Sequence, residues 1–190
     1  QGGEWRVEKQ RLRWDILDAF AQAAVEAGVP HTDGFNRGTN EGVGYFEVNQ
    51  RKGWRWNATK AFLRPVMSRP NLSVWTEAQV AKLNLSQDPA QGWSCDGAEV
   101  IHRGRRVSVK AKDGVVLAAG AIGSVQVLEL SGIGQPEVLQ AAGVDVQMPL
   151  AGVGANLQDH LQIRAVYEVQ HAKTLNTMAN SLWGKAAIGL

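Results

Sequence analysis

The fold is decided by residues 114–160, which read GVVLAAGAIGSVQVLELSGIGQPEVLQAAGVDVQMPLAGVGANLQDH. The stretch begins with a β-branched run, Val115 to Leu117, and then shrinks to the small residues 118–121. A buried strand that ends in small residues lets another molecule approach its backbone closely. We therefore expect a strand over residues 115–119, followed by a turn at which something is bound.

Capping residues in the same stretch predict two helices and a returning strand. A hydroxyl residue caps a helix start, proline suits the first helical position, and glycine ends a helix in the left-handed conformation. We therefore expect a first helix that is capped by Ser124, runs through Leu130 and is closed by Gly132 and Gly134. A second helix should begin at Pro136 and end at Gly143, and a strand should return at residues 144–146. This strand–helix–helix–strand unit is suited to binding a dinucleotide against its close turns.

Three motifs in this order, AAGAIGS, LSGIG and GVGANLQDH, resemble a known family. The first two resemble the second signature of the flavin-dependent glucose–methanol–choline (GMC) oxidoreductases, and the third resembles the loop that follows it. Val125 and Ala151 depart from the family, which usually has proline at both positions; each loss removes a preset φ but no chemical group. The resemblance implies a mixed α/β fold: part of an FAD-binding domain with a portion of the substrate-binding domain.

The resemblance also implies which residues contact FAD. Val80 matches a family valine that presents its backbone N–H and C=O to the adenine edge, although an ordinary strand-core role fits the same residue. Ala119 and Gly120 should hold the ADP half by backbone contact. Asn156 and its loop should lie closer to the pyrophosphate or the flavin.

The domain boundaries implied are a cap or substrate-side segment over residues 1–56, part of the FAD-binding domain over 57–160, and the start of the substrate-domain sheet over 161–190. The chain begins without methionine and stops in an apolar segment, so we expect it to be an internal piece of a longer polypeptide.

One position in the sequence bears on the identity of the substrate. Choline-oxidising relatives are similar in carrying an acidic residue two positions after the loop histidine, and this chain has Gln162 there, following His160. A cation in a closed pocket needs a carboxylate or an aromatic cage. Gln162 is either a substrate-cavity residue, which favours neutral primary alcohols, or a residue on the wet face of a strand.

No catalytic residue is expected within the chain. The family's glycine fingerprint, G-x-G-x-x-G, would lie upstream of Gln1, and the paired active-site histidine and its partner would lie downstream of Leu190. The four histidines show no metal-ligand spacing. By resemblance the parent is an FAD-dependent dehydrogenase or oxidase that passes hydride from a primary alcohol to flavin. A lyase of the same family and a non-catalytic interaction module stay open.

Composition fits such an enzyme and narrows the partners. The 190 residues are 44% hydrophobic and carry a net charge of +2, and their only dense basic cluster sits in an expected turn, so no nucleic-acid partner is predicted. The single cysteine forms no internal disulfide. Neither a signal peptide nor a long apolar run is recognisable, which favours a soluble, cytoplasmic protein, with peripheral membrane attachment left open. The electron acceptor stays unknown.

Elsewhere, periodicity predicts a helix over residues 14–27 and a hairpin turning at Gly104. Asn57 is expected to cap a helix that kinks at Pro65. The remaining expectations are a strand–turn–strand over 70–83, a loop over 84–96, an alternating strand over 161–169, and a loop with a helix over 174–190.

Overall fold

A computed structural model describes residues 3–188 and divides them into two compact units. The first unit holds the described residues up to 73 together with those from 164 onward. The second unit holds residues 74–163. Each unit is described by itself below.

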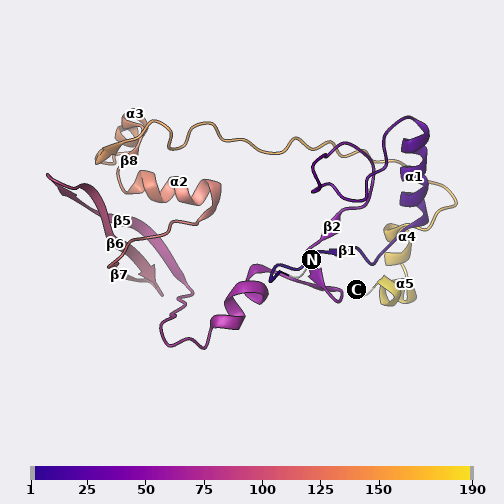
Figure 1. Cartoon of the computed structure of the whole chain (residues 1–190), viewed down its shortest axis with the longest axis horizontal. Coiled ribbons are helices and arrows are strands. Elements are labelled where there is room, and N and C mark those ends of the chain that lie inside the picture. Colours follow the sequence, from indigo (N-terminus) through magenta and orange to yellow (C-terminus); the bar gives the residue numbers. More distant parts are fainter. Residues whose placement is uncertain (1–2, 189–190) are drawn as a thin grey trace. The chain divides into compact units, whose positions relative to one another are not determined.

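The second unit is built on a three-stranded antiparallel sheet in the order β5-β6-β7 (Figure 1). Its strands are β5 (Ala78–Asp88), β6 (Gly92–His102) and β7 (Arg105–Lys110). The turn between β6 and β7 has φ of +48° at Arg103 and +76° at Gly104, so the predicted hairpin is confirmed. The loop expected over residues 84–96 is wrong: β5 continues to Asp88, whose carboxylate accepts the N–H of Ala90 and closes a tight turn.

The register gives this sheet one apolar and one polar face. Val80, Val100 and Val107 lie opposite one another on one face, and Val100 is 7% exposed. On the other face the side-chain amide of Asn84 donates to the Ser108 hydroxyl at 3.2 Å. Such alternation is typical of an antiparallel sheet with one face toward a core.

The strand–turn–strand expected over residues 70–83 is wrong before residue 78, where no strand forms.

After the sheet, the predicted helix–helix order is confirmed with shifted boundaries. The elements are α2 (Gly120–Leu130), β8 (Ile133–Gly134), α3 (Pro136–Ala141) and β9 (Met148–Pro149), with β8 and β9 parallel. Gly132 and Gly143 end the two helices at φ of +80° and +70°, as expected, whereas Gly134 lies in β8. The returning strand is therefore β9, not residues 144–146.

Two expectations around α2 need correction. Residues 115–119 form no strand, and Val116 is 93% exposed; a strand requires a hydrogen-bonding neighbour, and no described segment pairs there. Ser124 is not the N-cap, because α2 begins five residues earlier than expected, with Ala119 at the N-cap position. The Ser124 hydroxyl instead reaches back and accepts the Ala119 N–H at 3.2 Å.

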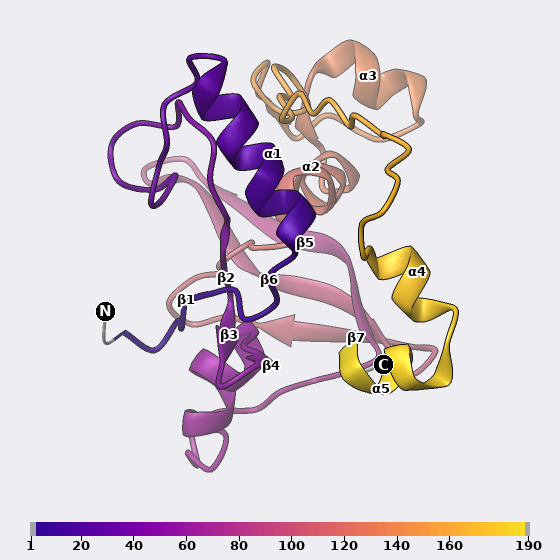
Figure 2. The ribbon, with the colours of Figure 1, turned by 90° about the vertical axis from the view of Figure 1, so that its right-hand side faces the viewer.

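The first unit consists of one longer helix, α1, and several short helices and strands (Figures 1 and 2). Its elements are β1 (Glu8–Lys9), α1 (Asp15–Glu26), β2 (Glu47–Val48), β3 (Gln50–Arg51), β4 (Trp54–Arg55), η1 (Thr59–Leu63), η2 (Arg64–Val66), α4 (Leu175–Ala179) and α5 (Leu182–Ile188). α1 confirms the predicted helix, and Asn57 caps η1 by accepting the Lys60 N–H at 3.1 Å. Pro65 lies in the 3-10 turn η2, as a kink requires.

The C-terminal part of this unit holds two helices rather than one. Thr174 caps α4 through a reciprocal pair of hydrogen bonds with Thr177, and α5 follows after a short break. The strand expected over residues 161–169 is wrong, since the segment is exposed and unpaired. Alternation alone does not make a strand without a neighbour on which to pair.

A charged cluster joins α1 to the loop before β2. The Asp18 carboxylate accepts hydrogen bonds from the Arg13 guanidinium at 2.9 Å and from the Tyr45 hydroxyl at 2.8 Å. The hydrogen bond from Arg13, and next that from Tyr45, lower the pKa of Asp18 below its ordinary value of 3.8. A carboxyl group whose pKa is lower in the folded state than in the unfolded state stabilises the fold at pH values above its unfolded-state pKa. This stabilisation is lost as the pH falls through the folded-state pKa.

We expect Tyr45→Phe to raise the pKa of Asp18 toward 3.8, because one of the two donors to the carboxylate is removed. NMR titration of the Asp18 carboxyl carbon measures it. The same titration of the wild-type protein is the reference. An unchanged Asp18 pKa in the variant would show that the Tyr45 hydrogen bond is not maintained in solution.

Candidate functional site

The predicted contact turn lies at the start of α2. Ala119 immediately precedes the helix, and Gly120 opens it with φ of +82°. Both residues are exposed, and a Cβ added at Gly120 would meet no atom within 4 Å. The backbone here is therefore open to approach from outside the chain.

The electrostatics of this turn favour a negatively charged group. The first N–H groups of a helix lack partners inside the helix and carry partial positive charge. The first turn of α2 contains no acidic residue. Because Ala119, Gly120 and Ala121 are small, no side chain there stands between a ligand and the backbone.

Asn156 lies beside the same helix. A hollow of about 630 Å³ is lined by one side of α2, from Ala121 to Glu129, and by the loop over residues 154–158. Asn156 is in that loop and has φ of +57°, a left-handed conformation that asparagine tolerates better than most residues. The structure thus brings Asn156 to the helix that Gly120 opens.

Val80 lies on β5, in its pair with Val100, and is 36% exposed. A register shift follows between Val80 and Lys82, which interrupts regular pairing immediately after Val80. Bulges of this kind redirect the backbone and occur next to binding sites as well as at sheet edges. The geometry is compatible with a backbone contact at Val80, and equally with a strand-core residue.

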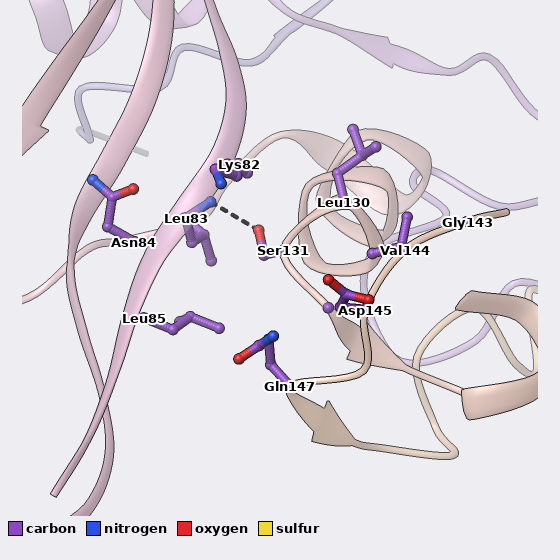
Figure 3. A pocket seen from close by; sticks show the side chains of 11 residues that line it. Lys82, Leu83, Asn84, Leu85, Leu130, Ser131, Gly143, Val144, Asp145 and Gln147 are labelled. Atoms are coloured by element: carbon purple, nitrogen blue, oxygen red, sulfur yellow. Dashed lines mark hydrogen bonds between the residues drawn. The ribbon is translucent and has the colours of Figure 1, made fainter. Parts of the chain in front are cut away.

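A buried serine, Ser131, ties β5 to α2. Its hydroxyl donates to the Val127 carbonyl at 2.5 Å and accepts the Leu83 N–H at 2.8 Å (Figure 3). This role was not predicted from the sequence, although the serine of the LSGIG motif, placed directly after an apolar helix, could have indicated a buried hydrogen-bonding residue. Ser131 fixes the strand that carries Val80 against the helix that begins at Gly120.

A second hollow, of about 530 Å³, surrounds this hydrogen bond between β5 and the segment after α3 (Figure 3). Its polar lining includes Lys82, Asn84, Asp145 and Gln147. None of the predicted cofactor residues lines it.

Gln162 is exposed and lies in a segment without helix or strand. The hollow beside α2 ends at Gln158 on this side, so Gln162 does not line it. The structure therefore brings Ala119, Gly120 and Asn156 to one helix and joins Val80 to it through Ser131, but it leaves Gln162 apart.

Comparison with known proteins identifies the family. The family model described as GMC oxidoreductase matches residues 4–162 of the chain. The chain belongs to the GMC oxidoreductase family. The family resemblance expected from the AAGAIGS, LSGIG and GVGANLQDH motifs is thereby confirmed.

Curated relatives of this GMC family member are named for choline and alcohol oxidation. It is 35% identical to mitochondrial choline dehydrogenase of Mus musculus, covering 99% of this chain and 30% of the relative. It is 39% identical to "Alcohol dehydrogenase [acceptor]" of Pseudomonas putida, covering 85% of this chain and 29% of the relative. The chain spans between 26% and 35% of the length of eight curated relatives that it matches.

Two solved structures share the fold. Pyridoxine 4-oxidase from Mesorbium loti superposes with a TM-score of 0.69 at 31% identity, over 80% of this chain and 29% of that one. An FAD-dependent oxidoreductase from Chaetomium thermophilum superposes with a TM-score of 0.75 at 27% identity, over 84% of this chain and 27% of that one. The predicted mixed α/β fold, typical of FAD-binding oxidoreductases, is confirmed.

Proposed function

We propose that this GMC family member is the central part of an FAD-dependent oxidoreductase that oxidises a primary alcohol. The observation that carries the proposal is the opening turn of α2, where Ala119 and Gly120 expose backbone beside the hollow that contains Asn156. The relatives' names support oxidation of alcohols as the reaction class.

The residues present fit an ADP-bearing cofactor. Ala119 and Gly120 offer small side chains, and the first turn of α2, which contains no acidic residue, offers helix N–H groups to a phosphate-bearing group. Val80 contributes a backbone edge to a flat ring, and Ser131 holds Val80's strand in place through the Leu83 N–H. Asn156 has a side-chain amide that can both donate and accept. FAD bound there would supply a hydride acceptor for alcohol oxidation.

The chain's own part in the reaction is positioning. A catalytic base is not proposed among these residues, and the base belongs to the remainder of the protein in this proposal. Residues 1–56 contribute to the substrate side, 57–160 to the FAD-binding domain and 161–190 to the start of the substrate-domain sheet. Holding a cofactor and a reactant in a fixed geometry accounts for a large part of such catalysis.

The absorbance spectrum of the full-length purified protein tests the proposal. A flavin band that bleaches anaerobically when a primary alcohol is added supports it. A flavin band that no alcohol bleaches, with cleavage of a hydroxynitrile instead, would establish the lyase alternative. Absence of any flavin would favour the non-catalytic interaction module.

We also propose that Gln162 lines the substrate cavity of the complete protein, so that neutral primary alcohols are preferred over choline. A glutamine offers no charge to a quaternary ammonium. Because the relatives are named for both choline and alcohol oxidation, the names alone do not choose between the substrates.

Gln162→Glu is expected to raise kcat/KM for choline by about tenfold, the effect of about 1.4 kcal/mol, while lowering it for neutral alcohols. Steady-state kinetics on the full-length enzyme measures both. Gln140→Glu, exposed on α3 and outside the hollow beside α2, is the matched control for added charge. A wild-type enzyme that prefers choline over neutral aliphatic and aromatic alcohols would contradict the assignment.

The cellular location is less constrained than the sequence suggested. Among the described residues, no helix combines the length and apolar character needed to cross a bilayer. A cytoplasmic location stays a prediction, since the choline dehydrogenase of Mus musculus is mitochondrial by its name.

A further inference from the structure

A further hollow, which is rich in positive charge, lies in the first unit, at the β3–β4 hairpin and the helical turns that follow it. It measures about 400 Å³, within the range of small-molecule pockets. Its lining consists of four cationic side chains and two indoles: Arg51, Lys52, Lys60, Arg64, Trp54 and Trp56. We call it the Trp54 pocket. All six residues come from one short segment, so the pocket does not depend on how the two units are placed.

Two of the cations are held in position. The Arg51 guanidinium lies over the Trp56 ring, 5.1 Å from its centroid. The Lys60 ammonium donates to the Arg55 carbonyl at 2.7 Å, which keeps its charge at the pocket wall. Trp56 is itself anchored, because its indole N–H donates to the Glu4 carbonyl at 2.8 Å. Positioned cations lose little freedom when an anion binds.

The positive charge of the pocket is largely uncompensated. Among the ion pairs formed by residues 3–188, none includes Arg51, Lys52, Lys60 or Arg64. The carboxylate that reaches this hairpin belongs to Glu8; its oxygens accept the backbone N–H of Lys52, each at 3.2 Å, and offset one of the four charges. Like charges held close together repel one another, and a bound anion with two negative charges would relieve that repulsion.

The indoles add a preference for a flat ring. Trp54 is 75% exposed although it lines the pocket, which leaves much of its ring face available. Aromatic rings stack in offset geometry on such a face. Arginine, in addition, pairs with phosphate through two parallel N–H donors.

We propose that the Trp54 pocket binds a phosphate-bearing small molecule, through residues none of which is among those proposed to hold flavin. Arg51, Lys52, Lys60 and Arg64 bind the phosphate, and Trp54 stacks on a ring if the ligand has one. This inference does not rest on the alcohol-oxidising function, because no residue of the pocket belongs to that site.

Titration calorimetry of the full-length, flavin-loaded protein tests the proposal, with inorganic pyrophosphate as the first probe and phenyl phosphate as the second. The double variant Lys52→Gln, Arg64→Gln should weaken pyrophosphate binding by about tenfold or more, since two charge-assisted contacts are removed. Trp54→Ala should weaken phenyl phosphate binding and leave pyrophosphate binding nearly unchanged.

The matched control is Arg106→Gln, Lys110→Gln on β7, which removes the same charge from the other unit. Equal losses in the control and pocket variants would overturn the proposal, because only net charge would matter. An absence of pyrophosphate binding in the wild type would overturn it too. So would binding confined to phosphatidylglycerol vesicles and lost in the pocket variant, since the pocket would then serve a membrane surface rather than a small molecule.

Discussion

Gly132→Ala is expected to destabilise the second unit by about 2–5 kcal/mol, the sum of left-handed backbone strain and overpacking. Gly132 has φ of +80° and is buried. A Cβ added there would lie 2.5 Å from the Asp145 carbonyl oxygen and 2.6 Å from a Gln147 side-chain carbon. Backbone cannot give way cheaply at the first of these contacts.

The same glycine also organises its surroundings. Its carbonyl accepts the N–H groups of Gln147 and Met148, at 2.9 and 3.0 Å, which position the start of β9 beside β8. Displacing this backbone to relieve the clash would disturb both hydrogen bonds. The loss of stability is therefore expected near the upper part of that range.

Gly143→Ala is the matched control for the first prediction. Gly143 has φ of +70°, but a Cβ added there meets nothing within 4 Å. Only the conformational cost of about 1–2 kcal/mol is expected. Urea unfolding of the full-length protein, followed by a signal from the second unit, measures both variants. Equal losses for the two would show that the close packing at Gly132 does not hold in solution.

Local chemistry allowed the helix boundaries of the second unit to be predicted from sequence. Pro136 and Gly143 marked α3 because their backbone preferences are set by covalent structure, whatever surrounds them. The strands were harder, because a strand exists only where another pairs with it. Residues 115–119 have strand composition yet no partner within the described chain, and residues 84–88 have a partner that their loop-like composition concealed.

The candidate site shows the same division. The unusual backbone of Gly120, with its φ of +82°, fits the expectation for a glycine among small residues, whereas its contact with FAD stays a prediction. Ser131 was not, because its role depends on Leu83, far away in the sequence, having its N–H at the end of α2. Asn156 was placed by family resemblance, and its position beside α2 keeps that assignment open to test.

Gly120→Val is expected to lower the flavin content of the full-length protein at least about tenfold, the equivalent of about 1.4 kcal/mol of binding free energy. Apart from its chain neighbours and the backbone of α2 itself, no described atom lies within 4 Å of the position that a Cβ would occupy. The added Cβ therefore points into open space, and we expect its steric effect to fall on a molecule that approaches the backbone there.

Backbone strain is the competing explanation, because valine is disfavoured at φ of +82°. Gly143→Val controls for it, since that glycine has a similar φ and equally open surroundings but follows the end of α3 instead of opening α2. The ratio of flavin to protein absorbance gives the occupancy, and circular dichroism reports the fold. Loss of flavin in Gly120→Val alone, with both variants folded, assigns the opening turn of α2 to the cofactor. Full flavin content in both variants would instead mean that the small residues at this turn serve the fold and that the cofactor lies elsewhere.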